Sequence, residues 1–203
     1  MVATAASAQV SFGIQGGVNL SNVTHSVEEV STNPKFGFNA GILADFGLTH
    51  NMGIRSGLFF HTKGFRAEIT EADIIDVRST TNLMYLQIPV HFAYKVDVMP
   101  GTRIVFHAGP YVAYGIGGSQ NFEVRRSPAD IQWGDESPVF GDDGFNRFDF
   151  GLGLGVGVEF GRFLTGIGWD MGLLNLANDN RRGFSEVPTI RNQNAYLTVG
   201  FRF

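Results

Sequence analysis

The chain has 203 residues, a formal net charge of −4 and no cysteine, which excludes disulfide scaffolds, cysteine-based zinc sites and thiol chemistry. The mild charge argues against a nucleic-acid partner, and no run of about 18 apolar residues offers a transmembrane helix. Only 17% of the residues are charged, beside 27 Gly and 19 Phe, which is poor material for a water-exposed surface.

The chain begins with a short alanine-rich segment. Ala6-Ser7-Ala8 fits the small-residue cleavage site of a secretory signal peptide. The apolar region that normally precedes such a site is missing, so a disordered leader remains the alternative reading. We expect residues 1–8 to be a signal-peptide remnant and residues 9–203 to form the folded domain.

Apolar residues then occupy alternate positions along eight stretches, which is the period of a β-strand with two different faces. In the first stretch, for example, Val10, Phe12 and Ile14 share one face. In chain order the stretches cover approximately residues 10–20, 35–46, 52–65, 82–94, 103–114, 147–160, 163–173 and 195–203. Each is long enough for a tilted strand to cross a bilayer, which takes about 9–11 residues.

The connections between the stretches are of two kinds. Three are short, namely 47–51, 95–102 and 161–162. Four are long, namely 21–34, 66–81, 115–146 and 174–193. Short turns at one end and long loops at the other are typical of bacterial outer-membrane barrels, whose turns face the periplasm. An even number of strands then places both termini in the periplasm.

The second face of each stretch indicates which side is lipid-exposed. A soluble ligand-binding barrel also alternates, but with its apolar face inward. Here the second face is rich in glycine and carries the charged residues, whereas the apolar face carries no Lys, Arg, Asp or Glu. A glycine-rich face suits the crowded interior of a small barrel, and a charge-free face suits lipid. The sequence therefore predicts an all-β fold, an eight-stranded antiparallel up-and-down transmembrane β-barrel.

Charged residues of the inner face fall near the ends of the strands that meet the short turns. Counting from those turns places four of them at similar depth: Asp45, Arg55, Glu159 and Arg202. Charges inside a narrow barrel are costly unless they are paired, so we expect an ion-pair network that closes the lumen.

Three histidines, His61, His91 and His107, also belong to the inner face. If the turn between the fourth and fifth strands is flanked by residues 94 and 103, antiparallel pairing places His91 directly opposite His107. Hydrogen-bonded lumen histidines are the simplest interpretation, and no metal or cofactor is predicted. Pro89 and Pro110 donate no ladder hydrogen bond, which predicts a bulge or local widening in these strands.

Several stretches resemble the PorT-like outer-membrane β-barrel family. They are residues 13–21 (GIQGGVNLS), 85–94 (YLQIPVHFAY), 109–118 (GPYVAYGIGG), 149–160 (DFGLGLGVGVEF) and 172–176 (GLLNL). The resemblance covers most of residues 9–203 and implies the barrel fold and the outer membrane as location. The alternating tail that ends in Phe203 looks like the C-terminal signal read by the barrel-assembly machinery. No catalytic residue is implied by the resemblance.

The function that these observations favour is a non-enzymatic outer-membrane barrel with a filled polar lumen. Its long extracellular loops would serve a structural, adhesive or secretion- and assembly-assisting role, with a protein partner there. Arg125-Arg126 and Arg181-Arg182, expected in those loops, can contact the phosphates of lipopolysaccharide.

Two alternatives remain, a small diffusion pore and a lipid-modifying enzyme. Eight strands leave an interior that side chains fill, which weakens the pore. The enzyme needs Ser, His and a carboxylate at the lipid-facing rim. The lipid face offers only Ser56, Thr62 and Thr165, with no His.

Overall fold

The computed structural model describes residues 9–25, 31–71, 75–126, 130–133, 137–140, 144–177 and 189–203. Among them no helix is long and apolar enough to cross a membrane. The strands are β1 (Gln9–His25), β2 (Ser31–Gly47), β3 (Met52–Glu71), β4 (Ile75–Met99), β5 (Thr102–Arg126), β6 (Asp130–Trp133), β7 (Ser137–Pro138), β8 (Phe148–Phe160), β9 (Phe163–Gly172) and β10 (Ile190–Arg202).

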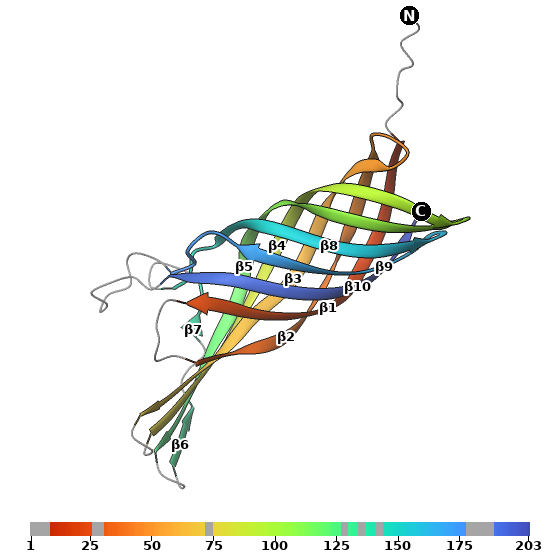
Figure 1. Cartoon of the computed structure of the whole chain (residues 1–203). Coiled ribbons are helices and arrows are strands. Elements are labelled where there is room, and N and C mark those ends of the chain that lie inside the picture. Colours follow the sequence, from red (N-terminus) through yellow and green to blue (C-terminus); the bar gives the residue numbers. More distant parts are fainter. Residues whose placement is uncertain are drawn as a thin grey trace, which may run out of the picture.

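Eight of these strands close into a barrel. Each of them pairs antiparallel with the next long strand in the chain, and β10 returns to pair with β1. The closing pair runs from Gly13 opposite Arg202 to His25 opposite Ile190. Figure 1 shows the tilted strands wound around one lumen. The predicted fold class, an eight-stranded antiparallel β-barrel, is confirmed.

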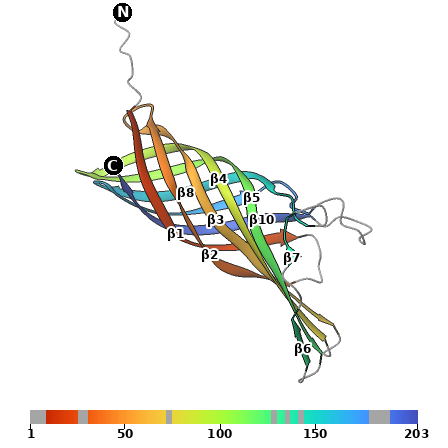
Figure 2. The ribbon, with the colours of Figure 1, turned by 180° about the vertical axis from the view of Figure 1, so that it is seen from behind.

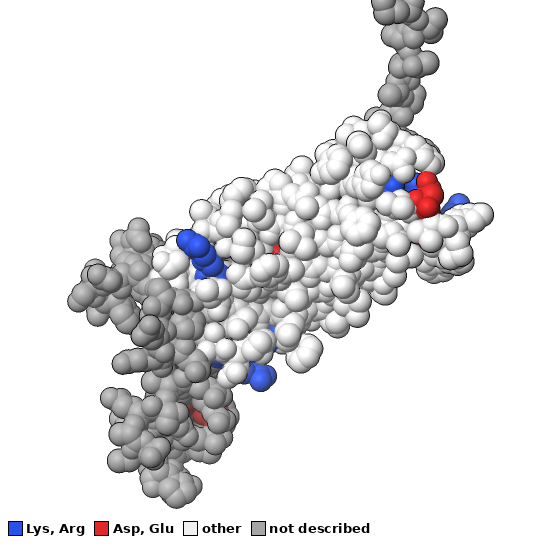
Figure 3. All heavy atoms as spheres, in the orientation of Figure 1, with Lys and Arg blue, Asp and Glu red and all other residues white. Residues whose placement is uncertain are grey.

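The two faces of the wall differ as the alternation predicts. Phe12, Ile42 and Leu154 point outward and keep 58%, 59% and 55% of their surface exposed. The face of the wall in Figure 3 is almost free of charged side chains between the two ends of the barrel. An apolar, uncharged belt of this kind is what a bilayer requires of the residues that contact it.

Glycine lines the inner face because neighbouring strands leave no room for a side chain. A Cβ atom added at Gly17 would lie 1.9 Å from the carbonyl oxygen of Leu197, and one at Gly41 would lie 2.3 Å from that of Leu58. The glycine-rich face therefore faces the crowded lumen, as expected for a barrel of this size.

The tight connections gather at one end of the barrel, which we call the turn end. There β4 reaches β5 through Pro100 and Gly101, and β8 reaches β9 through Gly161 and Arg162. Gly101 and Gly161 have φ values of 77° and 57°, a conformation that glycine adopts without strain. The start of β1 and the end of β10 lie at this same end, as Figures 1 and 2 show. We call the opposite end the outer end.

Six strands, β1 to β5 and β10, are longer than the sequence predicts. β3, β4 and β5 continue as a paired ribbon beyond the barrel, where Glu71 pairs with Ile75 and Ile75 pairs with Arg126 (Figure 2). The expected loops 66–81 and 115–146 are therefore largely strand, and short β6 and β7 add to β5. The prediction was wrong here because the apolar alternation stops where the chain leaves the lipid, although backbone pairing continues.

Pro89 and Pro110 are accommodated without a bulge. The ladder between β4 and β5 skips Val90 and His91, but its register is the same on both sides of the gap. Register shifts occur elsewhere, between Met84 and Tyr85 and near the turn. Prolines in these central strands therefore cost ladder hydrogen bonds locally and leave the strand alignment unchanged.

Candidate functional site

The charged side chains of the lumen gather where the strands meet the turn end. Asp45 of β2 lies directly opposite Arg55 of β3 in the ladder. Glu159 of β8 lies directly opposite Arg103 of β5. Directly opposed residues point their side chains to the same face of a sheet, so both pairs enter the lumen together.

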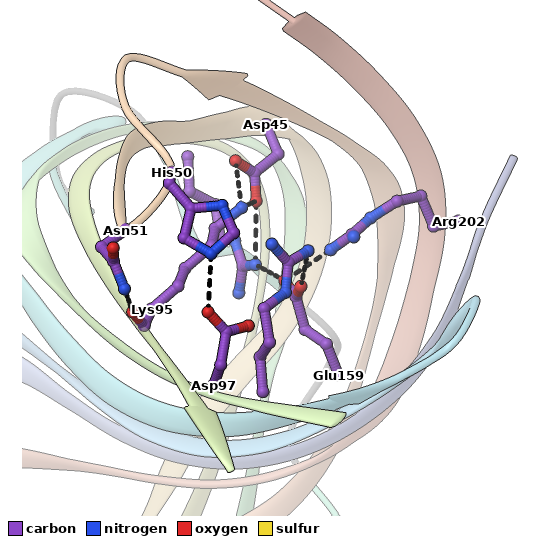
Figure 4. A network of polar contacts seen from close by, with 9 residues as sticks. Asp45, His50, Asn51, Lys95, Asp97, Glu159 and Arg202 are labelled. Atoms are coloured by element: carbon purple, nitrogen blue, oxygen red, sulfur yellow. Dashed lines mark hydrogen bonds and ion pairs between the residues drawn. The ribbon is translucent and has the colours of Figure 1, made fainter. Parts of the chain in front are cut away.

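Arg55 joins the two carboxylates across the barrel. Its Nη2 donates hydrogen bonds to Asp45 Oδ2 at 3.0 Å and to Glu159 Oε1 at 2.7 Å. Lys95 Nζ, from β4, donates to both carboxylate oxygens of Asp45 at 2.9 Å. In Figure 4, Asp45 and Glu159 enter the lumen from opposite parts of the wall, with Lys95 reaching toward Asp45.

Glu159 is the most heavily paired carboxylate. In addition to Arg55, Arg103 donates from Nη2 to its Oε2 at 2.8 Å, and Arg202 of β10 contacts its Oε1. The structure thus brings together all four charged residues that the sequence singles out and adds two more. We call the six residues the turn-end network: Asp45, Arg55, Lys95, Arg103, Glu159 and Arg202.

The network lies largely out of reach of water. The Asp45 and Glu159 side chains keep 2% and 4% of their surface exposed. Removing one partner of such a buried pair typically costs about 3–5 kcal/mol, because the remaining charge stays buried. The planar guanidinium of Arg55 suits the bridging position, since it offers several donors in one plane. The network therefore fixes strands from different parts of the barrel to one another.

His91 and His107 meet in the middle of the lumen, but not in the predicted register. Ala93, not His91, lies opposite His107, because the strands continue to a tighter turn than the sequence predicts. The two histidines are diagonal neighbours whose rings stack 5.2 Å apart, with 3.0 Å between their Nδ1 atoms. The prediction of a direct pair was wrong by two residues, whereas the expected contact is present.

A small cavity of about 70 Å³, lined by polar and apolar side chains, lies beside the histidine pair. Its lining includes buried atoms without a hydrogen-bond partner among the described residues: Asn39 Nδ2, Arg55 Nε, His61 Nδ1, His91 Nε2 and Asp170 Oδ1. A water molecule needs about 10–15 Å³ of such volume, so the cavity can hold a few. Among the described residues no group of three His, Cys, Asp or Glu could hold a metal ion.

Two further groups of hydrogen-bonded polar side chains are buried in the lumen, and the first of them borders the cavity. Lys63 Nζ donates to Gln87 Oε1 at 2.9 Å, and Gln87 Nε2 donates to Asp170 Oδ2 at 3.0 Å. Tyr111 donates to Asp149 Oδ2 at 3.2 Å, an oxygen that also accepts from Asn192 at 2.8 Å. Each of these charged groups is buried and has polar partners, as buried charges require.

Toward the outer end the lumen is closed by apolar side chains. Val139, Phe140 and Phe145, which we call the outer plug, come from the connection between β5 and β8 and are all buried. The Phe140 ring packs edge-on against Tyr85 at 5.7 Å between centroids, and Phe145 packs likewise against Phe65 at 6.1 Å. The lumen is therefore filled by charged side chains at the turn end and by apolar side chains toward the outer end.

Sequence reasoning missed part of this arrangement. Lys95 and Arg103 have the same strand parity as the lumen residues His91 and His107. Arg103 begins the predicted stretch 103–114, and extending the stretch 82–94 by one residue adds Lys95. The outer plug has no comparable signal, because residues in an irregular connection show no period. Its contacts depend on tertiary packing alone.

Other predicted residues lie as follows. Phe203 is 69% exposed at the turn end, and its backbone N–H donates to Phe12 O at 2.9 Å. Arg125 and Arg126 belong to the end of β5, in the ribbon and not in a loop. Arg181, Arg182 and the predicted leader 1–8 lie outside the described residues.

Solved outer-membrane barrels align with most of this chain. The attachment invasion locus protein Ail of Yersinia pestis, solved with the heparin analogue sucrose octasulfate, is 14% identical over 96% of this chain and 99% of Ail, with a TM-score of 0.45. Neisserial surface protein A is 14% identical over 96% and 99%, with a TM-score of 0.42. OprG of Pseudomonas aeruginosa is 11% identical over 97% of both chains, with a TM-score of 0.44.

The family of the chain is shown by its sequence and not by these distant structures. A search among curated proteins gave no match. Residues 5–178 match the profile described as "Outer membrane protein beta-barrel domain", which is well over half of the 203 residues. Such a domain lies in the bacterial outer membrane, in contact with its lipids. The chain belongs to the outer membrane protein beta-barrel domain family.

Proposed function

We propose that this protein is a non-enzymatic outer-membrane barrel whose work is done at its outer end and not through its lumen. The observation that carries the proposal is the double closure of the lumen, by the turn-end network and by the outer plug. A barrel filled in this way offers partners its outer end, where β3, β4 and β5 extend beyond the wall. The role is structural, adhesive or secretion- and assembly-assisting.

The orientation and partners follow from the same proposal. With the turn end in the periplasm, both termini are periplasmic and the ribbon is extracellular. Lipopolysaccharide and a protein partner then meet the outer end, and the barrel-assembly machinery reads Phe203 during insertion. The motifs at residues 85–94 and 109–118 support placing the chain among the PorT-like barrels.

The hydroxyl groups of the lipid face support a role without catalysis. Ser56 Oγ donates to Pro89 O at 2.8 Å, Thr62 Oγ1 to Phe38 O at 3.2 Å and Thr165 Oγ1 to Thr198 O at 3.2 Å. A hydroxyl nucleophile needs a neighbouring base to take its proton, whereas these three hydroxyls donate to backbone carbonyls.

A second candidate, a narrow pore, is favoured by one observation. The 70 Å³ cavity between the two closures has polar side chains such as Gln87 and Asp170 in its wall, so fluctuations of either closure can admit water. Liposome swelling separates the candidates: sugar-driven swelling faster than that of empty liposomes supports the pore, and equal rates support the closed barrel.

Photo-crosslinking in intact cells tests where partners bind. A crosslinkable residue replaces exposed Arg66 at the outer end of β3, and the matched control replaces lipid-facing Leu154 of β8. We expect discrete protein or lipopolysaccharide adducts from position 66 and only phospholipid adducts from position 154. Identical adducts from the two positions would contradict the proposal.

A further inference from the structure

The turn end contains a second pocket, outside the closed part of the lumen. It has a volume of about 410 Å³, and its lining includes Lys95, Arg103, Arg202 and Asp45. In Figure 4, Lys95 and Arg202 approach this space from opposite parts of the wall. We call it the vestibule. It is distinct from the 70 Å³ cavity deeper in the lumen.

Among the turn-end network residues that line the vestibule, three are basic, Lys95, Arg103 and Arg202, and one is acidic, Asp45. The turn-end network contains four basic groups, Arg55, Lys95, Arg103 and Arg202, but only two carboxylates, Asp45 and Glu159. Asp97 lies outside this network: its side chain is 49% exposed, so water screens its charge, and it contacts the His50 ring at 2.8 Å. Surplus charge that is partly removed from water favours a compensating anion.

The hydrogen bonds show the same imbalance. All four oxygens of Asp45 and Glu159 already accept from Arg55, Lys95, Arg103 or Arg202. The Nε atom of Arg202, a residue that lines the vestibule, is buried and has no partner among the described residues. Arg103 uses one Nη2 bond to Glu159, and its side chain is 29% exposed. Donors therefore outnumber acceptors at the side of the network that faces the vestibule.

We propose that the vestibule binds a phosphate group, presented either by a soluble phosphate or by a lipid headgroup. A phosphate offers several acceptor oxygens, which match guanidinium donors that come from different strands. It would dock against Arg103 and Arg202, with Lys95 behind them. The proposal goes beyond the function proposed above, since it concerns the turn end and holds whatever the outer end binds.

Inorganic phosphate is the first probe. Protein in phosphatidylcholine nanodiscs is titrated with phosphate at constant chloride and ionic strength. Binding is followed by calorimetry and by the ¹H–¹⁵N resonances of the arginine Nε groups. We expect saturable binding and shifts of the Arg103 and Arg202 resonances. The absence of saturable heat together with unmoved resonances would overturn the proposal.

Two variants with opposite expected effects separate binding from a merely structural role. Arg103→Gln removes a donor and should weaken phosphate binding about tenfold. Glu159→Gln removes a competing acceptor and one negative charge, so it should tighten binding several-fold. Arg191→Gln is the matched control, since Arg191 is exposed on β10 at the outer end. Equal affinity in the native protein, Arg103→Gln and Arg191→Gln would refute the site.

Heat-dependent gel migration confirms that each variant is folded before it is titrated. If Glu159→Gln does not fold, the comparison of Arg103→Gln with Arg191→Gln still decides the matter. Nanodiscs that contain phosphatidylglycerol distinguish the two sources. Competition by this lipid, seen as weaker phosphate binding, supports a headgroup ligand, and unchanged binding supports a soluble phosphate.

Discussion

Single charged residues of the lumen are predictable because strand parity and depth are both readable from the sequence. Asp45, Arg55, Glu159 and Arg202 were each assigned to the inner face a few residues from a short turn, and the structure joins them directly. The position of His91 relative to His107 was not predictable, because register depends on where the turn begins. An error of two residues in the turn moved the pair from opposite to diagonal.

Arg55 is the residue of the turn-end network whose loss should cost the most stability, because within that network it is the one that hydrogen-bonds to both carboxylates. Arg55→Met should lower the free energy of unfolding in lipid by about 3 kcal/mol, since it leaves two buried carboxylates with fewer partners. Arg191→Met, at an exposed position, should change it by less than about 0.5 kcal/mol. Urea titrations of the two variants make the comparison. Equal, small losses would show that water and not Arg55 compensates these charges.

Whether a strand segment could be predicted from the sequence depends on its environment. The strand segments inside the lipid belt were predicted because lipid on one face and lumen on the other impose a period of two. The extensions of β3, β4 and β5 were not predicted, because neither face of them meets lipid. The outer plug was not predicted for a related reason, since its three apolar residues lie in an irregular connection.

Gly115 of β5 makes room for the outer plug. A Cβ at this position would lie 2.3 Å from the Phe140 ring, so Gly115→Ala should displace the plug while the barrel stays folded. At Gly117 the nearest atom, Met84 Sδ, lies at 4.0 Å, which makes Gly117→Ala the matched control. Hydrogen exchange at the Phe145 amide, which donates to Val139 O, should accelerate about tenfold only in the first variant. Equal exchange in both variants would argue against a packed plug.

The last strand offers a test of assembly. Phe203→Asp should reduce the yield of inserted protein in cells if the terminal aromatic is read during insertion. Phe163→Asp is the control, because Phe163 is similarly exposed at the turn end, with 64% of its surface accessible against 69% for Phe203. Membrane fractionation measures both yields. Equal reductions would mean that Phe203 serves only as one aromatic among several at that end.

At the scale of the whole molecule, the ladder closes on itself and leaves no sheet edge in the lipid belt, as a spanning sheet requires. The closed wall, the apolar exterior and the glycine-rich interior were all predictable, because each follows from the bilayer as solvent. Of the two groups of side chains that fill the ends, one could be predicted. The turn-end network could be inferred from its charged residues, whereas the outer plug could not be inferred.

The most direct test of this account is the conductance of the purified protein in a planar bilayer. The unmodified protein should show no stable, large open state, because the turn-end network and the outer plug both close the lumen. Neutralising Arg55 and Glu159 together should raise leakage, and adding Gly115→Ala should raise it further. A steady, porin-sized conductance in the unmodified protein would contradict the closed-lumen account and make the pore the leading function.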